Sequence, residues 1–193
     1  MTKIVMSRHE EPAPARSVRL NRLRGLSTVL ARLSVLFAAL LPVLMLAYWW
    51  LTPTEALFRQ AGLVQVPPAW IGFPMRLAGF ALSMIPLAAL VLGLLSARGC
   101  FTSFAAGRVF SSEAARGLRG LALGVGASAL LSPLAGAALS LLLSTQSPVG
   151  MRSVVFSVGS DSLLSLLFAA MVAAIASVLV EAADIAAENE QFV

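Results

Sequence analysis

Residues 98–119, RGCFTSFAAGRVFSSEAARGLR, separate two long apolar stretches, and they decide how the rest of the chain is organised. Within this segment, Gly107 can end one helix, and Ser111 or Ser112 can cap the next helix. Glu113 would then lie in the first turn, where a carboxylate interacts favourably with the positive end of the helix. The segment therefore predicts a short connection between two long helices.

The composition predicts that these helices cross a membrane. Of the 193 residues, 59% are apolar and only 12% are charged, whereas about 25% are charged in a typical soluble protein. Four stretches contain no charged residue and are long enough to cross the hydrocarbon core, which takes roughly 20 helical residues. They predict spans at residues 30–51, 75–97, 120–143 and 162–181.

We therefore expect an all-α fold, an integral membrane four-helix transmembrane bundle. The spans make up a transmembrane domain of residues 30–182. It is preceded by a basic N-terminal segment, residues 1–29, and followed by an acidic tail, residues 183–193.

Positive charge is distributed unevenly between the two sides of the predicted bundle. Three basic residues, Arg59, Arg76 and Arg152, fall on one side, and the other 11 of the 14 Lys and Arg residues fall on the side of the N-terminus. Because positively charged loops remain in the cytoplasm, both termini are expected there. This bias accounts for the net charge of +5, and direct binding of nucleic acid is not expected.

The first loop on the outer side, residues 52–74, is predicted to contain a short helix over residues 56–61 that stops at Gly62. It is flanked by the aromatic trio Tyr48-Trp49-Trp50 and by Trp70. Tyr and Trp favour the level of the lipid headgroups because they combine an apolar ring with a polar group. We therefore expect these aromatic residues at the membrane interface.

Prolines and small residues predict how the spans pack. Each of the first three spans contains a central proline, Pro42, Pro86 or Pro133, and neighbouring helices can accommodate the resulting kinks. The third span opens with Gly120 and Gly124 in a small-xxx-small pattern, which lets helix backbones approach closely. We expect this pattern to pack helices within one chain, and a homo-oligomer is the alternative.

The spans lack the groups that membrane enzymes and ion-coupled transporters use. Ionisable residues inside a membrane are functional candidates, but here Arg32, Arg76 and Glu181 all lie at span ends. His9 is the only histidine and Cys100 the only cysteine. No metal or cofactor site is therefore predicted, and we do not expect an enzyme.

Two motifs resemble those of a known family. The run Gly107-Arg-Val-Phe110-Ser111-Ser-Glu113 with Leu118-Arg119-Gly120 resembles the signature of the bacterial inner-membrane family catalogued as domain of unknown function 2975. The C-terminal part matches through Gly159-Ser-Asp161, Glu181-Ala182, Ala187-Glu188-Asn189 and Phe192-Val193. The resemblance covers nearly everything after residue 25 and implies a small multi-pass protein of the bacterial inner membrane without an assigned activity. Some members are encoded beside small helix-turn-helix regulators, which implies a membrane-bound partner of a transcription factor.

We interpret the chain as a regulatory or scaffolding protein that binds a cytoplasmic or membrane protein through its cytoplasmic face, in contact with the lipid bilayer. Opposite charges also allow the acidic tail to dock on the basic N-terminal segment, although exposed pairs contribute only about 0–1 kcal/mol each. The candidate partner-binding residues are Gly107, Phe110, Ser111, Glu113, Arg116, Arg119, Glu181 and Glu188.

The alternative interpretation is a small permease or a channel-like oligomer. It is motivated by the three central prolines and by the serines of the third span. This alternative predicts a water-filled cavity lined by Ser83, Ser128, Ser132 and Ser140.

Overall fold

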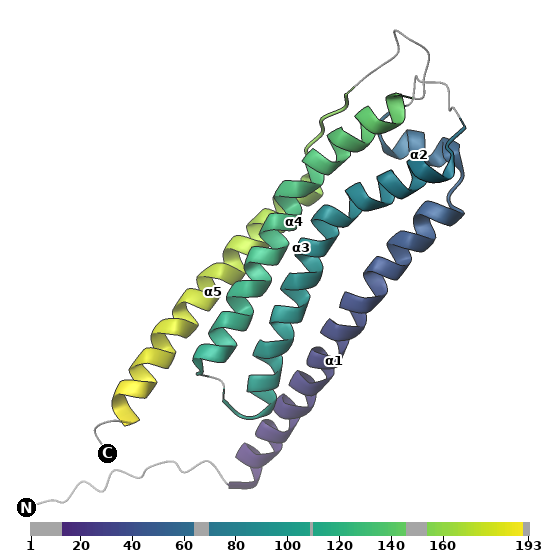
Figure 1. Cartoon of the computed structure of the whole chain (residues 1–193). Coiled ribbons are helices and arrows are strands. Elements are labelled where there is room, and N and C mark those ends of the chain that lie inside the picture. The colour runs from purple at the N-terminus through teal and green to yellow at the C-terminus, as the bar shows by residue number, and fades with distance from the viewer. Residues whose placement is uncertain (1–12, 64–69, 109, 146–153, 191–193) are drawn as a thin grey trace, which may run out of the picture.

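The computed structural model describes residues 13–63, 70–108, 110–145 and 154–190, and within them it consists of helices joined by short connections. The predicted all-α fold is therefore confirmed. Residues 1–12 of the basic N-terminal segment and residues 191–193 of the acidic tail lie outside the described residues. The helices are α1 Ala13–Leu51, α2 Thr54–Gln60, α3 Phe73–Ala105, α4 Ser112–Ser144 and α5 Ser160–Glu190 (Figure 1).

Four of these helices are long and apolar enough to cross a membrane, as the sequence predicts. All four exceed the roughly 20 residues that a crossing needs, so the chain is a multi-pass membrane protein. Helix α1 begins at Ala13, so part of the basic N-terminal segment continues into the first span as one helix. The apolar stretches are Leu23–Leu51, Phe73–Ala105, Ser112–Ser144 and Ser160–Ile185.

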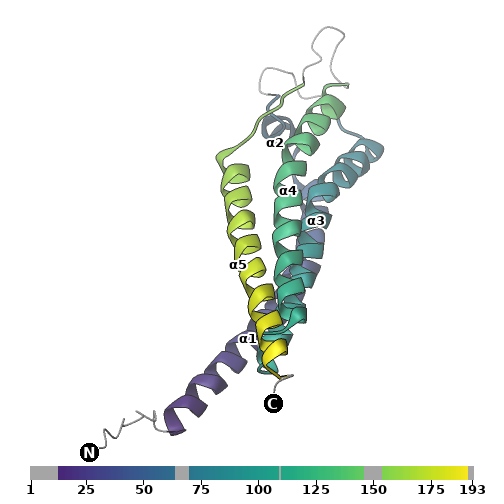
Figure 2. The same ribbon diagram turned by 90° about the vertical axis from the view of Figure 1, so that its left-hand side faces the viewer.

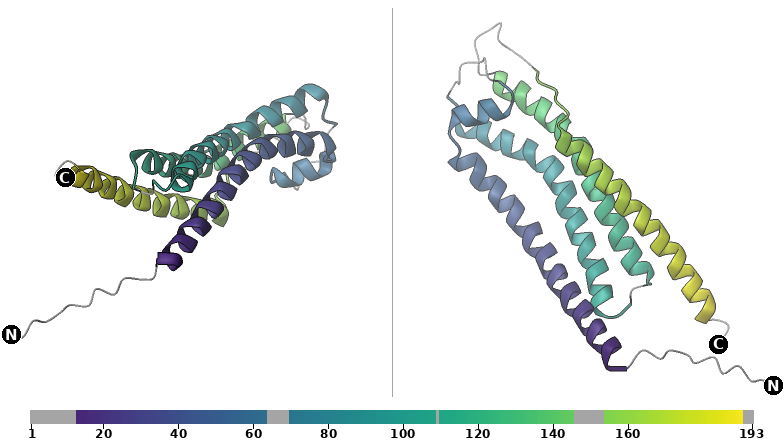
Figure 3. Two further views of the ribbon diagram at one scale, coloured as in Figure 1. Left: turned by 90° about the horizontal axis from the view of Figure 1, so that it is seen from below. Right: turned by 180° about the vertical axis from the view of Figure 1, so that it is seen from behind.

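The four long helices lie side by side in chain order. Helix α3 packs against α1 on one side and against α4 on the other, and α5 packs against α4 (Figures 1 and 3). Figure 2 shows α1 inclined to the other long helices. The start of α1, the end of α5 and the α3–α4 turn, residues 106–111, lie at one end of the molecule, which we call the turn end. Helix α2 lies at the opposite end, which we call the α2 end.

The three prolines lie inside long helices and do not end them. Pro42 lies in α1, Pro86 in α3 and Pro133 in α4. Each proline lacks the N–H that would complete a helical hydrogen bond, and packing against neighbouring helices makes this tolerable in a membrane. The prediction of a central proline in each of the first three spans is thus confirmed.

Glycines on α4 bring its backbone very close to that of α3. A Cβ atom on Gly124 would lie 2.5 Å from the Cα of Gly93, and one on Gly117 would lie 2.6 Å from the backbone nitrogen of Cys100. Gly120 faces α3 between them. Small residues at helical spacing permit such an approach, and close packing holds helices together in lipid. The prediction that this pattern packs helices within one chain is confirmed.

At the α2 end, α2 folds back on the long helices and completes a small apolar core. It begins after Pro53 and ends before Gly62, which has a φ of +78°. This left-handed conformation favours glycine, so the predicted stop is confirmed. The buried members of the core are Trp49, Leu57, Phe58, Ala61, Leu63, Ile71 and Leu143.

Burial divides the aromatic trio, and Trp49 belongs to the core of the protein. Its side chain is only 1% exposed, whereas Trp50 is 41% exposed. The ring lies against Gly79 of α3, where a Cβ would come within 2.1 Å of it. Its Nε1 donates a hydrogen bond to the Oγ of Ser83 at 3.2 Å. Because the indole N–H is satisfied inside the protein, Trp49 can belong to the core.

Arg76 ties the start of α3 to the end of α1. Its Nη1 donates hydrogen bonds to the carbonyl oxygens of Trp49 and Thr52, the latter at 3.2 Å. The last carbonyl groups of a helix have no partner within the helix, and a cation at that end is favourable. The sequence predicts that Arg76 lies at the end of a span but not which groups it bonds to, and the structure shows its hydrogen-bond partners.

Candidate functional site

The α3–α4 turn begins with Gly107, the first residue of the predicted motif. Gly107 has a φ of +81°, which favours glycine, and its N–H donates to the carbonyl oxygen of Phe104 at 2.9 Å. The N–H of Arg108 donates to the carbonyl oxygen of Ser103 at 3.0 Å. These two bonds satisfy carbonyl groups at the end of α3. Gly107 therefore ends the helix, as predicted.

Ser111 is the N-cap of α4, as predicted. Its backbone is extended, with a φ of −129° and a ψ of 145°. Its Oγ accepts a hydrogen bond from the N–H of Ala114 at 3.2 Å and donates one to the carbonyl oxygen of Arg108 at 3.1 Å. One hydroxyl group thus joins the turn to the first turn of α4.

Glu113 lies in the first turn of α4 and holds the turn from the other side. Its Oε2 accepts hydrogen bonds from the Nη2 of Arg108 at 3.0 Å and from the Oγ of Ser103 at 3.4 Å. The side chains of the ion pair are 62% and 53% exposed, so we assign the pair only about 0–1 kcal/mol. The main consequence is geometric, because Glu113 connects the first turn of α4 to the turn through Arg108 and to the last turn of α3 through Ser103.

Ser103 and Arg24 belong to this site, and the sequence analysis missed both. Ser103 is 2% exposed, although its hydroxyl reaches the carboxylate of Glu113. The Nη2 of Arg24, on α1, would lie 3.2 Å from a Cβ on Gly107. Nothing local in the sequence indicates either contact, because the contact of Ser103 depends on how the chain folds back at the turn and that of Arg24 on how α1 packs against α3.

The remaining motif residues of the turn and of α4 point away from the protein. Phe110 is 62% exposed at the tip of the turn. Arg116 and Arg119 are both exposed on the first two turns of α4. Arg119 also lines a groove of 570 Å³ between α4 and α5. The turn end therefore presents an aromatic ring beside cationic side chains.

The acidic residues of α5 lie toward the turn end, where α5 ends and α1 begins. Glu181 and Glu188 are exposed. An ion pair joins Arg108 to Glu113. The side chains of Arg16, Arg19, Arg22 and Glu190 are not among those described, so docking of the acidic tail on the basic N-terminal segment stays a prediction. Among the described residues, no group of three or more His, Cys, Asp and Glu side chains could hold a metal ion.

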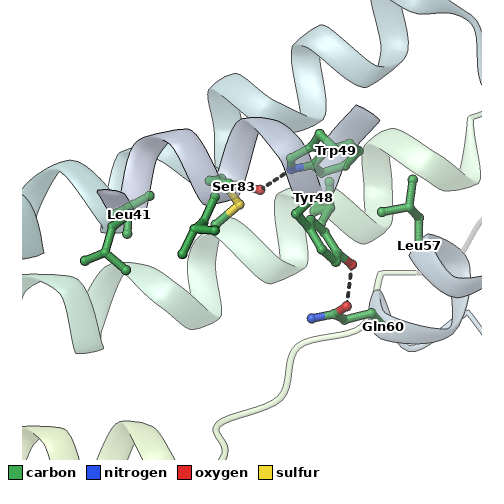
Figure 4. A pocket seen from close by; sticks show the side chains of 10 residues that line it. Leu41, Tyr48, Trp49, Leu57, Gln60 and Ser83 are labelled. Atoms are coloured by element: carbon green, nitrogen blue, oxygen red, sulfur yellow. Dashed lines mark hydrogen bonds between the residues drawn. The ribbon is translucent and has the colours of Figure 1, made fainter. Parts of the chain in front are cut away.

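A separate cavity of 340 Å³ lies toward the α2 end, between α1, α2, α3 and α4 (Figure 4). Its wall includes Trp49 with its partner Ser83, and Tyr48, whose hydroxyl donates to the Oε1 of Gln60. Most of its other lining residues are leucines, such as Leu41 and Leu57 in Figure 4. This cavity is therefore mainly apolar, with its polar groups already paired to one another.

The four serines named for the permease alternative do not all line any one of the cavities described for residues 13–63, 70–108, 110–145 and 154–190. Ser83 lines the cavity of Figure 4, and Ser132 lines a different one of 220 Å³. Ser140 is fully buried, and its Oγ accepts a hydrogen bond from the N–H of Val155 at 2.9 Å. The backbone carbonyl of Ser128 accepts a hydrogen bond from Ser132 within α4. The hydroxyls of Ser83, Ser132 and Ser140 thus bond to backbone groups, and the permease alternative stays a prediction.

Comparison with known proteins identifies the family but gives no activity. Residues 33–193 match the family described as "Protein of unknown function (DUF2975)". No curated protein and no solved structure matches the chain. The match includes the whole α3–α4 turn and all four apolar stretches except the first turns of the one in α1. The chain therefore belongs to the DUF2975 family of proteins of unknown function.

Proposed function

We propose that this protein is a regulatory or scaffolding protein of the bacterial inner membrane, which binds a cytoplasmic protein through its turn end. It acts by binding and not by catalysis. The observation that carries the proposal is the α3–α4 turn, where an internally bonded connection presents the exposed ring of Phe110.

Rigidity of the turn supports this proposal. Ser111 caps α4, Gly107 ends α3, and Glu113 of α4 bonds to Ser103 of α3 and to Arg108 of the turn. A binding surface on such a support loses less conformational entropy when a partner docks than one on a loose loop. Exposed aromatic residues are frequent anchors of protein–protein contacts.

The positive charges at the turn end, where Phe110 lies, indicate the chemistry of the partner. Arg116 and Arg119 are exposed on α4, and Arg24 of α1 lies beside Gly107. The partner should therefore offer an apolar pocket for the ring with acidic groups at its rim. By the positive-inside rule, the excess of basic residues at this end supports a cytoplasmic location for it.

Site-specific photo-crosslinking in intact cells tests the proposal. A photoreactive phenylalanine analogue replaces Phe110 in the full chain, and the same analogue at Phe156 is the matched control. Phe156 is exposed to a similar extent, 60% against 62%, and it lies on the connection between α4 and α5 at the α2 end. We expect a discrete protein adduct from position 110 alone, competed away by untagged protein and reduced by Ser111→Ala. Adducts with lipid alone at position 110, or the same adducts at both positions, would refute the proposal.

A further inference from the structure

A groove of 480 Å³ runs between α1 and α3 at the turn end. It is distinct from the α3–α4 turn, because its walls come from the two neighbouring helices of Figure 1. Each wall contributes one arginine and one threonine. The lining residues include Thr28, Arg32 and Val35 of α1 and Arg98, Thr102 and Ala105 of α3.

The polar part of the groove is built to receive an anion. Arg32 and Arg98 are exposed, and none of the described residues that line the groove carries a carboxylate. The hydroxyls of Thr28 and Thr102 donate to carbonyl oxygens of their own helices, each at 2.9 Å. Among the side chains lining the groove, the donors without a hydrogen bond to another described residue are the two guanidinium groups, each with five N–H bonds. Two such groups suit the oxygens of a phosphate.

The depth of the groove in the bilayer identifies the source of this phosphate. Arg32 and Leu51 are separated by about 28 Å along the axis of α1. This length is close to the thickness of the hydrocarbon core, roughly 30 Å. With Leu51 at one edge of the core, Arg32 lies at the other edge, at the level of the lipid phosphates.

The apolar part of the groove continues toward the middle of the membrane. Val35 lines it, and Leu36 beside it is 57% exposed. On α3, Leu95 precedes Arg98 by one turn and is 43% exposed. The groove thus combines two cations at the headgroup level with apolar side chains below them, which matches a phospholipid in both charge and orientation. A free phosphate ion would use only the cationic part.

We propose that this groove is a specific binding site for one anionic phospholipid of the same leaflet. Arg32 and Arg98 hold its phosphate from opposite walls, and an acyl chain follows Val35 along α1. Basic pockets between membrane helices bind anionic headgroups in this way. The site differs from general attraction of lipid to positive charge, because it requires both walls of one groove.

Native mass spectrometry of the full chain in an uncharged detergent tests the site. The delipidated protein is titrated with phosphatidylglycerol, and with phosphatidylcholine in parallel. We expect one phosphatidylglycerol to bind with clear preference. The variant Arg98→Gln should raise its dissociation constant about fivefold, and Arg32→Gln with Arg98→Gln about 30-fold, from the attraction of one cation near a lipid surface.

The matched control is Arg116→Gln, which removes one exposed cation from the same end without touching the groove. We expect the dissociation constant of phosphatidylglycerol to stay within about twofold of wild type, because both walls of the groove keep their arginines. Equal weakening by Arg98→Gln and Arg116→Gln would overturn the proposal in favour of general electrostatic attraction. Equal binding of the two lipids would also overturn it. Inorganic phosphate is also titrated alone and in competition with phosphatidylglycerol. If it displaced the lipid at the concentration at which phosphate itself binds, the site would be one for free phosphate, and the phospholipid proposal would be overturned.

Discussion

Replacement of Gly124 by alanine tests the backbone contact that holds α3 against α4. The new Cβ would lie 2.5 Å from the Cα of Gly93 and 2.7 Å from both the carbonyl oxygen of Ala89 and the nitrogen of Gly93. Non-bonded carbon atoms prefer about 3.5–4.0 Å, so the two backbones must separate by about 1 Å. All three neighbours are backbone atoms, and no rotation of a side chain can relieve the contact.

The expected cost follows from this geometry. Overpacking costs about 1–3 kcal/mol, and we expect the upper end because only helix movement relieves it. A gap of about 1 Å elsewhere along the seam also forfeits a quarter to a half of each dispersion contact. Alanine is a better helix former than glycine by about 1 kcal/mol, which offsets part of this cost. Gly124→Ala should therefore lower the free energy of unfolding by about 2 kcal/mol.

Gly136→Ala is the matched control on the same helix. In the described part of the chain, a Cβ there would meet no neighbouring atom within 4 Å. Both variants share the gain in helix propensity, so their difference, about 3 kcal/mol, measures the steric cost alone. The assay is reversible unfolding in mixed micelles of an uncharged detergent and dodecyl sulfate, followed by circular dichroism. Surface substitutions ordinarily change the free energy of unfolding by up to about 0.5 kcal/mol. If the free energies of unfolding of the two variants differed by less than this, the steric argument for Gly124 would be refuted.

Two further predictions use the same unfolding assay. Ser111→Ala removes the N-cap of α4 and should lower the free energy of unfolding by about 1 kcal/mol. Ser112→Ala, one residue inside the helix, is the control and should change it by less than about 0.5 kcal/mol. Equal effects of the two substitutions would show that the cap hydrogen bond contributes nothing to stability. Trp49→Phe replaces the buried indole by a smaller ring, removes its hydrogen bond to Ser83, and should lower the free energy of unfolding by about 1–3 kcal/mol. Trp50→Phe changes a ring that is 41% exposed and should have a smaller effect, and the reverse order would contradict the burial of Trp49.

Much of the candidate site could be predicted from the sequence because its signals are local. Gly107 indicates a helix end and Ser111 a helix start, and both act through hydrogen bonds to residues three or four positions away. The contact between Ser103 and Glu113 could not be predicted in this way. It joins two helices, and the sequence of neither helix indicates how the turn brings the two side chains together.

The aromatic trio shows the limit of such prediction at the α2 end. Tyr48, Trp49 and Trp50 are equally suited to the membrane interface by their chemistry. Trp49 becomes a core residue only because Gly79 leaves room for its ring and Ser83 accepts its hydrogen bond. Both partners lie on another helix, about 30 residues further along the chain.

By itself, the sequence determined that this protein is all-α, crosses the membrane four times and has capped helices on either side of residues 106–111. These properties follow from apolar length and from short-range hydrogen bonds. Only the tertiary structure decided that Gly124 meets Gly93, that Arg76 bonds to the end of α1, and that Arg32 and Arg98 share one groove. The physical reason is that side chains facing lipid and side chains facing another helix are equally apolar. Hydrophobicity therefore does not indicate which face of a span packs against another helix. That choice depends on close contacts between distant segments, and it exists only once the helices are assembled.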